Sequence, residues 1–137
     1  MIINAKDAIL GRLGTYVAKQ ALLGNKVDVI NCEETLVSGR KHAILKEYIR
    51  RIKRKAPGKG PFLYRRPDML VKRTIRGMLP FKRARGREAF KNIKCHVGVP
   101  DNLKNEKYVM VESAGSEKLG ADYLKVKDIC RAIGGKQ

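Results

Sequence analysis

The sequence predicts an α/β fold with parallel strands, because it opens with a strand, a helix and a second strand. Residues 2–4 and residues 27–31 are short apolar segments. Between them, over residues 8–23, apolar side chains recur every three or four positions, which is the spacing of one helix face; they are Leu10, Leu13, Val17 and Ala21. A strand–helix–strand unit of this kind favours parallel pairing with a right-handed crossover.

Turn-forming and capping residues mark the boundaries of this first unit. Asp7 is a suitable N-cap for the helix and Gly24 is a suitable stop. A further strand is predicted over residues 35–37, after which Ser38 and Gly39 turn the chain.

The middle of the chain is predicted to hold three helices and one loop. A helix over residues 42–55 carries an apolar stripe made of Ile44, Leu45, Tyr48, Ile49 and Ile52. Residues 56–67 contain three prolines and two glycines, which exclude a regular helix and predict an extended, exposed loop. Asp68 is predicted to cap the next helix, over residues 68–78, and Pro80 ends it.

The two helices after the loop have inward and outward faces. Over residues 68–78 the inward side chains are Val71, Ile75 and Met78, and the outward ones are Lys72, Arg73 and Arg76. A short helix over residues 86–92 has Ala89, Phe90 and Ile93 inward, with Arg83, Arg87 and Lys91 outward at steps of four.

The last third of the chain is predicted to add two strands and a helix. Residues 93–99 alternate as a strand does, and residues 108–111 form a short apolar run. A helix over residues 126–133 has one apolar side made of Val126, Ile129, Cys130 and Ile133. Because 137 residues without an internal repeat are typical of one domain, residues 1–137 are expected to form a single domain.

Positive charge is concentrated in one segment. The chain has 31 Lys and Arg against 13 Asp and Glu, a net charge of +18. Residues 40–91 hold nineteen of these cations and three acids, so +16 lies there, whereas residues 1–39 are neutral and residues 92–137 carry +2. Such a surplus indicates a polyanionic partner, first nucleic acid and second an anionic membrane surface; simple solubility is the alternative. Because the charge is confined to one segment, we predict a nucleic-acid-binding site over residues 40–91.

Several features of this segment favour RNA. Arginine outnumbers lysine over residues 65–87, and a guanidinium can hold a phosphate bidentately or stack on a base. Phe62 and Tyr64 lie between basic residues and can stack on unpaired bases, or alternatively be buried under the loop. For Lys72, Arg73 and Arg76 the alternative is a solvated helix face. The predicted RNA-binding residues are Arg40, Lys41, Arg50, Arg51, Lys53, Arg54, Lys55, Lys59, Phe62, Tyr64, Arg65, Arg66, Lys72, Arg73, Arg76, Lys82, Arg83, Arg85, Arg87 and Lys91.

The cysteines and histidines do not indicate a metal, disulfide or catalytic site. Cys32, Cys95 and Cys130 are odd in number and widely spaced, so reduced and mostly buried thiols are expected, with Cys95 and His96 in one strand. No nucleophile–base set or ligand spacing is present, so no catalytic residue, metal or cofactor is expected. Reduced thiols fit an intracellular compartment, and no signal peptide or transmembrane-length apolar run is recognised, so we expect a cytoplasmic protein without a membrane partner. Without a catalytic set, no small-molecule substrate is expected.

A nucleotide-binding alternative rests on Gly11-Arg12-Leu13-Gly14, which follows the first strand. The full glycine fingerprint and the terminal Lys-Ser/Thr of a phosphate loop are both missing, so the signal is weak. Gly14 is instead expected to let the helix pack closely on the sheet. The alternative function is a nucleotide-binding or RNA-modifying enzyme that uses the N-terminal α/β half.

Longer motifs resemble one family. They are Leu10-Gly11-Arg12-Leu13, Val17-Ala18-Lys19, Val29-Ile30-Asn31-Cys32-Glu33, Val37-Ser38-Gly39, Arg73-Thr74-Ile75-Arg76-Gly77-Met78-Leu79-Pro80, Arg85-Gly86-Arg87 and Gly98-Val99-Pro100. Together the chain resembles the universal large-subunit ribosomal protein thirteen family, and residues 60–68 resemble its archaeal and eukaryotic branch. Gly14 departs from the Ala common in the family, and residues 101–122 match no motif.

The resemblance implies a three-layer α/β/α fold with a mainly parallel, Rossmann-like sheet, extended by a basic loop and helices. It implies a structural constituent of the large ribosomal subunit, with large-subunit rRNA and neighbouring large-subunit proteins as partners, a part in early assembly and no enzymatic activity. A free RNA-binding regulator of translation is a weaker alternative.

Overall fold

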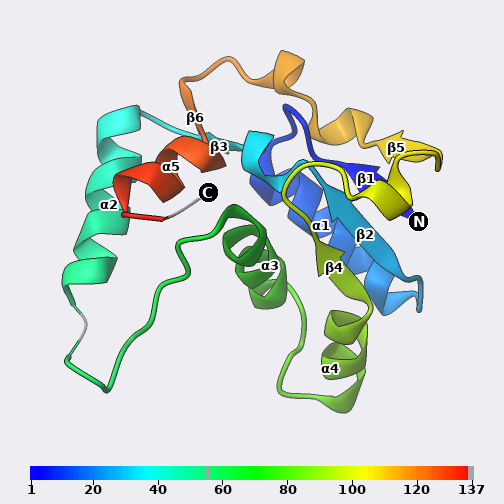
Figure 1. Ribbon diagram of the computed structural model, residues 1–137, viewed down its shortest axis with the longest axis horizontal. Coiled ribbons are helices and arrows are strands. Elements are labelled where there is room, and N and C mark those ends of the chain that lie inside the picture. The colour runs from blue at the N-terminus through cyan, green and yellow to red at the C-terminus, as the bar shows by residue number, and fades with distance from the viewer. Residues whose placement is uncertain (55, 136–137) are drawn as a thin grey trace.

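The chain has the predicted α/β fold, built on a parallel sheet (Figure 1). A computed structural model describes residues 1–54 and 56–135. The four-stranded sheet has the order β4-β2-β1-β5, and each neighbouring pair is parallel. Its strands are β1 (Ile2–Asn4), β2 (Val27–Ile30), β4 (Ile93–Cys95) and β5 (Tyr108–Met110). A separate antiparallel pair joins β3 (Leu36–Ser38) to β6 (Tyr123–Lys125).

Helices flank the sheet, which confirms the expected three-layer α/β/α arrangement with a mainly parallel sheet. They are α1 (Leu10–Leu22), α2 (Lys41–Lys53), α3 (Pro67–Gly77), α4 (Ala84–Lys91) and α5 (Val126–Ala132). Short 3-10 turns lie at Cys32–Glu34, Asp101–Leu103, Glu112–Ala114 and Ser116–Lys118. In Figure 1, α2 and α5 lie at one side of the molecule and the sheet with α1 at the other, while α3 and α4 lie between and below them.

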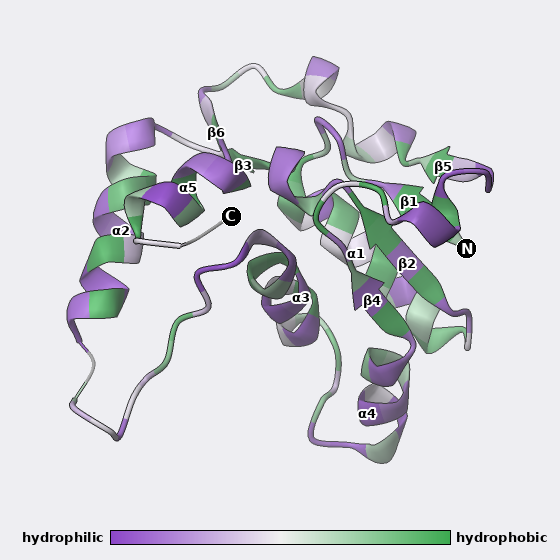
Figure 2. Ribbon diagram, in the orientation of Figure 1, coloured by the Kyte–Doolittle hydropathy of each residue, from purple (hydrophilic) through white to green (hydrophobic). Residues whose placement is uncertain are grey.

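The core forms where α1 packs beside the sheet. Ile3, Val29 and Ile93, on three neighbouring strands, are completely buried. Leu13 and Val17 of α1 are also completely buried, as their helical spacing predicted. Figure 2 shows the same pattern, with hydrophobic strands in the sheet and strongly hydrophilic residues on α2 and α4. Burial of this apolar surface is the main stabilising contribution to the fold.

Two predicted N-caps are wrong. The first helix begins at Leu10, because Ala8 and Ile9 are held extended by hydrogen bonds, from the amide of Leu36 to the Ala8 carbonyl and from the Ile9 amide to the Ala114 carbonyl. Asp7 instead takes a left-handed backbone conformation with φ of 54°. Asp68 lies in the first turn of α3, because Pro67, whose φ is already helical, occupies the first helical position.

Other predicted boundaries are confirmed or shortened. Gly24 and Gly39 both take positive φ values, of 94° and 130°, where the chain leaves α1 and β3. The strand predicted over residues 93–99 ends at Cys95, so His96 is not part of it. The chain bends there because Gly98, with φ of 66°, donates its amide hydrogen to both carboxylate oxygens of Glu33.

The C-terminal helix docks on the rest of the fold as its apolar side predicted. Val126, Ile129, Cys130 and Ile133 are buried. Lys125 and Lys127, at the start of α5, form ion pairs with Glu34, which follows β2. The two hydrogen bonds from these ammonium groups lower the pKa of the Glu34 carboxyl to about 2.

The cysteines are free thiols, as expected; Cys32 and Cys130 are buried and Cys95 is partly buried. Hydrogen bonding to Cys95 and burial raise the pKa of the Cys32 thiol, and burial raises that of Cys130 to about 11. Over residues 1–54 and 56–135, no helix is long and apolar enough to cross a membrane.

Candidate nucleic-acid interface

The predicted RNA-binding side chains lie at the molecular surface. Within the described part of the chain all of them are exposed except Lys72 and Arg76, which are partly buried; Lys55 lies outside the described residues. They form two groups. The α2 surface consists of Arg40, Lys41, Arg50, Arg51, Lys53 and Arg54. The α3–α4 surface consists of Lys72, Arg73, Arg76, Lys82, Arg83, Arg85, Arg87 and Lys91. The loop over residues 56–66 connects them and carries Lys59, Phe62, Tyr64, Arg65 and Arg66.

Helix α3 supplies the α3–α4 surface with a stripe of side chains opposite its buried face. The buried face is Leu70, Val71 and Ile75, continued beyond the helix by Leu79. The stripe on the other side is Met69, Lys72, Arg73 and Arg76, at helical spacings of three and four. Met78, predicted to point inward, is 39% exposed and lies over α1 near Gly14, so that part of the prediction is wrong.

Two of the α3 cations rest on aromatic rings. The Arg76 guanidinium carbon lies 3.9 Å from the centroid of the Phe81 ring, and the Lys72 ammonium lies 5.0 Å from that of Phe90. The two rings meet edge to face, with centroids 5.4 Å apart. These contacts stabilise the cations by cation–π attraction and limit their rotamer freedom. The alternative of a freely solvated helix face therefore does not describe Lys72 and Arg76.

Helix α4 adds a second row of cations. Arg83, Arg87 and Lys91 are exposed at steps of four, as predicted, and Ala89 and Ile93 are buried. Phe90, predicted to point inward, is only partly buried because one side of its ring meets Lys72. The Lys72–Phe90 contact therefore joins the end of α4 to α3.

The cations of the α3–α4 surface are not neutralised within the protein. In the described part of the chain, none of the eight forms an ion pair with an acidic side chain. Arg85 makes one long hydrogen bond, of 3.5 Å, to the carbonyl oxygen of Leu22. Their mutual repulsion is thus uncompensated, which an approaching polyanion would relieve.

The α2 surface is partly neutralised. The Glu47 carboxylate accepts hydrogen bonds of 2.9 Å from Arg50 and Arg51. These bonds lower the pKa of the Glu47 carboxyl to about 2, so it stays ionised at neutral pH. One negative charge therefore offsets part of the positive charge at the end of α2.

The apolar stripe of α2 is not wholly buried. Ile44 is buried and Tyr48 is partly buried, whereas Ile49 is 38% exposed. Ile49 and Leu45 line a shallow hollow of about 640 Å³ whose rim includes Lys46. Sequence reasoning missed Lys46, although its four-residue step to Arg50 is the kind of signal that identified the other cations.

The loop aromatics differ in their surroundings. Phe62 is 76% exposed, so the alternative of burial beneath the loop is wrong for it. Tyr64 is 42% exposed and lines a hollow of about 290 Å³ together with Met69, Phe81 and Phe90. Sequence reasoning missed that Met69, Phe81 and Phe90 line this hollow. The position of Met69 in the outward stripe of α3 could have indicated its exposure. No local sequence pattern indicates that the two phenylalanines line the hollow.

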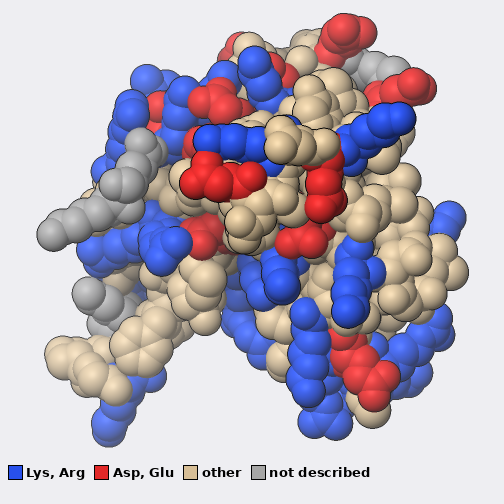
Figure 3. Space-filling view, turned by 45° about the vertical axis from the view of Figure 1, so that its right-hand side comes forward, with Lys and Arg blue, Asp and Glu red and all other residues tan. Residues whose placement is uncertain are grey.

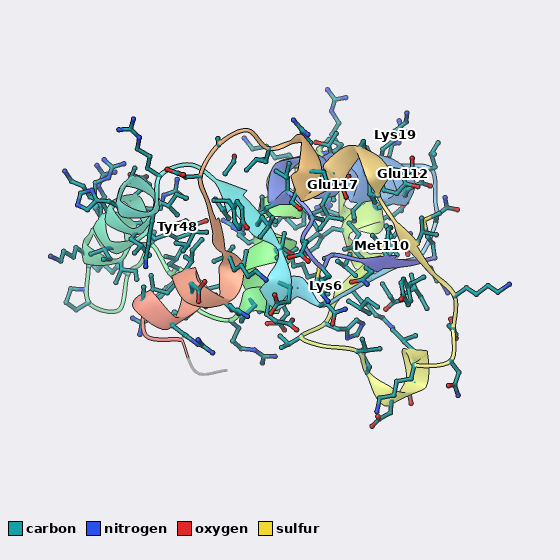
Figure 4. All side chains as sticks on the ribbon, turned by 90° about the horizontal axis from the view of Figure 1, so that it is seen from above. Lys6, Lys19, Tyr48, Met110, Glu112 and Glu117 are labelled. Carbon is teal, nitrogen blue, oxygen red and sulfur yellow. The ribbon has the colours of Figure 1, made fainter. Side chains whose placement is uncertain are left out.

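The rest of the molecular surface carries most of the acids. Figure 3 shows Lys and Arg along the left side and the lower part of the molecule, toward α2 and α4, and Asp and Glu mainly across its middle and top. In this view the acids therefore lie mainly away from the left side and the lower part of the molecule. Figure 4 shows Glu112 and Glu117 along the upper edge of the molecule, away from α2, with Lys19 near Glu112.

Gly11 and Gly14 lie within α1 and do not form a phosphate-binding loop. Gly11 is exposed in α1, and a Cβ atom there would meet nothing within 4 Å. Gly14 is buried, but it packs against Met78 and Ile75 of α3 and not on the sheet, contrary to expectation. Over the described residues, no three His, Cys, Asp or Glu side chains are grouped as metal ligands.

Comparisons with known proteins agree with the resemblance. Residues 1–102 match the family model described as ribosomal protein L13. The chain is 40% identical over 137 residues to the large ribosomal subunit protein uL13 of Methanosarcina barkeri, covering 98% of each chain. It is 41% identical over 140 residues to the uL13 protein of Methanococcus maripaludis, covering 99% of this chain and 98% of that one. A match to the uL13 protein of Methanopyrus kandleri is 48% identical over 99 residues, 72% of this chain and 62% of that one.

Proposed function

Because this chain belongs to the ribosomal protein L13 family, of archaeal type, we propose that it is a structural constituent of the large ribosomal subunit. In this role it binds large-subunit rRNA through residues 40–91. The single observation that carries the proposal is the α3–α4 surface, whose eight cations form no ion pair with an acidic side chain among the described residues. The chain is not an enzyme, since its family is a structural one.

The mechanism is electrostatic. Folding a large RNA brings phosphates together, and Lys and Arg offset their repulsion while releasing condensed counterions. Such contacts fix the position and shape of RNA more than they read its sequence. Because Lys72 and Arg76 are already held on aromatic rings, binding costs them little conformational entropy.

The fold supports this role by holding the two basic surfaces at fixed positions. The loop between them leads directly into α3, and its last residues pack against Gly135, where a Cβ atom would clash with the Arg65 carbonyl oxygen. The α2 and α3–α4 surfaces can therefore contact separate RNA elements and hold them together. Bridging of this kind supports a part in early subunit assembly, alongside neighbouring large-subunit proteins.

Sedimentation of cell lysates tests the proposal. A tagged chain is expected to migrate with large ribosomal subunits and to remain there through moderate salt washes. If it occurs only in the free pool, the ribosomal role is contradicted, and a free RNA-binding regulator becomes the better account.

A further inference from the structure

We propose that the hollow between Tyr64, α3 and α4 is a binding site for one unpaired RNA base. The inference rests on the proposed function and deepens it. It adds recognition of one base to a surface that otherwise binds phosphates. The hollow, of about 290 Å³, lies near the lower limit of small-molecule pockets, which suits a ligand of the size of one base.

Three separate parts of the chain form the walls of the hollow. Tyr64 comes from the loop, and Met69 and Arg73 come from α3. Phe81 precedes α4, and Phe90 lies near the end of α4. Tyr64 and Met69 are 42% and 36% exposed, so their apolar atoms are accessible from solvent. Large apolar side chains left open on so charged a surface indicate a ligand with an apolar face.

The two ring-bound cations make the hollow suitable for a base. The Arg76 guanidinium carbon lies 3.9 Å from the centroid of the Phe81 ring, and Arg76 also lines the hollow, so its planar guanidinium can offer a base a stacking surface. Arginine planes and aromatic rings are the surfaces on which unpaired bases stack. Lys72, which lies over Phe90, also lines the hollow and can donate a hydrogen bond to a base edge.

The neighbouring surface suits the phosphates on either side of such a base. A second hollow, of about 630 Å³, adjoins the first and shares Arg73, Arg76 and Phe81 with it. Lys82 and Arg83 line its far side. A nucleotide whose base enters the smaller hollow would thus place its backbone along the larger, cationic one. An apolar peptide side chain would leave these cations without partners, so the charge favours RNA.

Two short RNA hairpins test the site with the full-length protein. Both carry one bulged nucleotide at the same position, but in one of them the bulged nucleotide is abasic, so the number of phosphates and the bend are matched. The wild-type protein is expected to bind the base-bearing hairpin about tenfold more tightly. Tyr64→Ala and Arg76→Lys should each abolish this preference, because each removes a flat surface for the base, whatever effect they have on the affinity for the abasic hairpin.

Phe62→Ala is the matched control, because Phe62 lies on the same loop but outside the hollow, and it should keep the tenfold preference. Equal, salt-sensitive binding of both hairpins by the wild type would overturn the base site and leave the RNA-binding function standing. A preference that survives Tyr64→Ala and Arg76→Lys would also overturn the base site. Binding of neither hairpin would overturn the base site and count against the proposed function as well.

Discussion

The carbonyl oxygen of Pro80 occupies the place of a side chain on Gly86: a Cβ there would lie 2.1 Å from this oxygen. Gly86 is buried in the first turn of α4, and Pro80 follows the end of α3. This contact fixes the tight turn that brings the cations of α4 beside those of α3. The motif that ends at Pro80 and the motif Arg85-Gly86-Arg87 therefore meet in one backbone contact.

Gly86→Ala should disrupt this contact. The new methyl group cannot avoid the Pro80 backbone without moving α4, so the free energy of unfolding should fall by about 1–3 kcal/mol. Chemical denaturation measures the loss, and RNA affinity should fall with it. Gly77→Ala is the control, because a Cβ on Gly77 meets nothing within 4 Å. Equal stability of the two variants would contradict the steric account.

Gly14→Ala should be tolerated. A Cβ on Gly14 would lie 3.0 Å from the Met78 sulfur, but that sulfur is near the end of a flexible, 39% exposed side chain. Replacing glycine by alanine within a helix stabilises it by up to ~1 kcal/mol. The melting temperature should therefore change little or rise slightly. A decrease of more than about 2 kcal/mol in the free energy of unfolding would mean that the Met78 side chain cannot move aside.

Glu47→Gln should strengthen RNA binding. It removes the charge that Arg50 and Arg51 share and leaves both guanidinium groups available to phosphates. Affinity at low salt should rise about two- to fivefold, and the salt dependence should become steeper. Filter binding over a series of salt concentrations measures both. Unchanged affinity would indicate that the α2 surface does not contact RNA.

The Glu34 ion pairs should make stability depend on acidic pH. The pKa of Glu34 is lowered from 4.5 to about 2 in the fold, so its contribution is complete above pH 4.5 and is lost as pH falls toward 2. Glu34→Gln should lower the free energy of unfolding by about 1–2 kcal/mol at pH 7, allowing for solvent screening. The two proteins should converge in stability near pH 2. A constant difference over this range would contradict the ion-pair account.

The sequence alone predicts the helices that bury one side, because apolar residues then recur along the chain at a regular spacing. Leu13 and Val17 in α1, and Val71 and Ile75 in α3, lie on the faces that their spacing indicates. It does not predict β6, whose three residues carry no apolar run and whose pairing with β3 depends on distant contacts.

The candidate site is also predictable only in part, because some of its features are local in the sequence and others depend on tertiary contacts. Charge density identifies the cations of α3 and α4 without any structure. The placement of Arg76 over Phe81 is different, because the chain turns at Pro80 between them and only the tertiary fold brings the two side chains together. The hollow beside Tyr64 is unpredictable for the same reason, since three separate parts of the chain form it.

Reversal of charge on the α3–α4 surface tests the central claim most directly. Arg73, Lys82, Arg83 and Arg87 are all exposed, so changing the four to Glu should leave the circular dichroism spectrum intact. The matched control changes Arg12, Lys19, Lys26 and Lys94, four exposed cations outside residues 40–91, to Glu. We predict that the first variant is absent from large ribosomal subunits and that the second is incorporated. Normal incorporation of the first variant would contradict the assignment of this surface to rRNA.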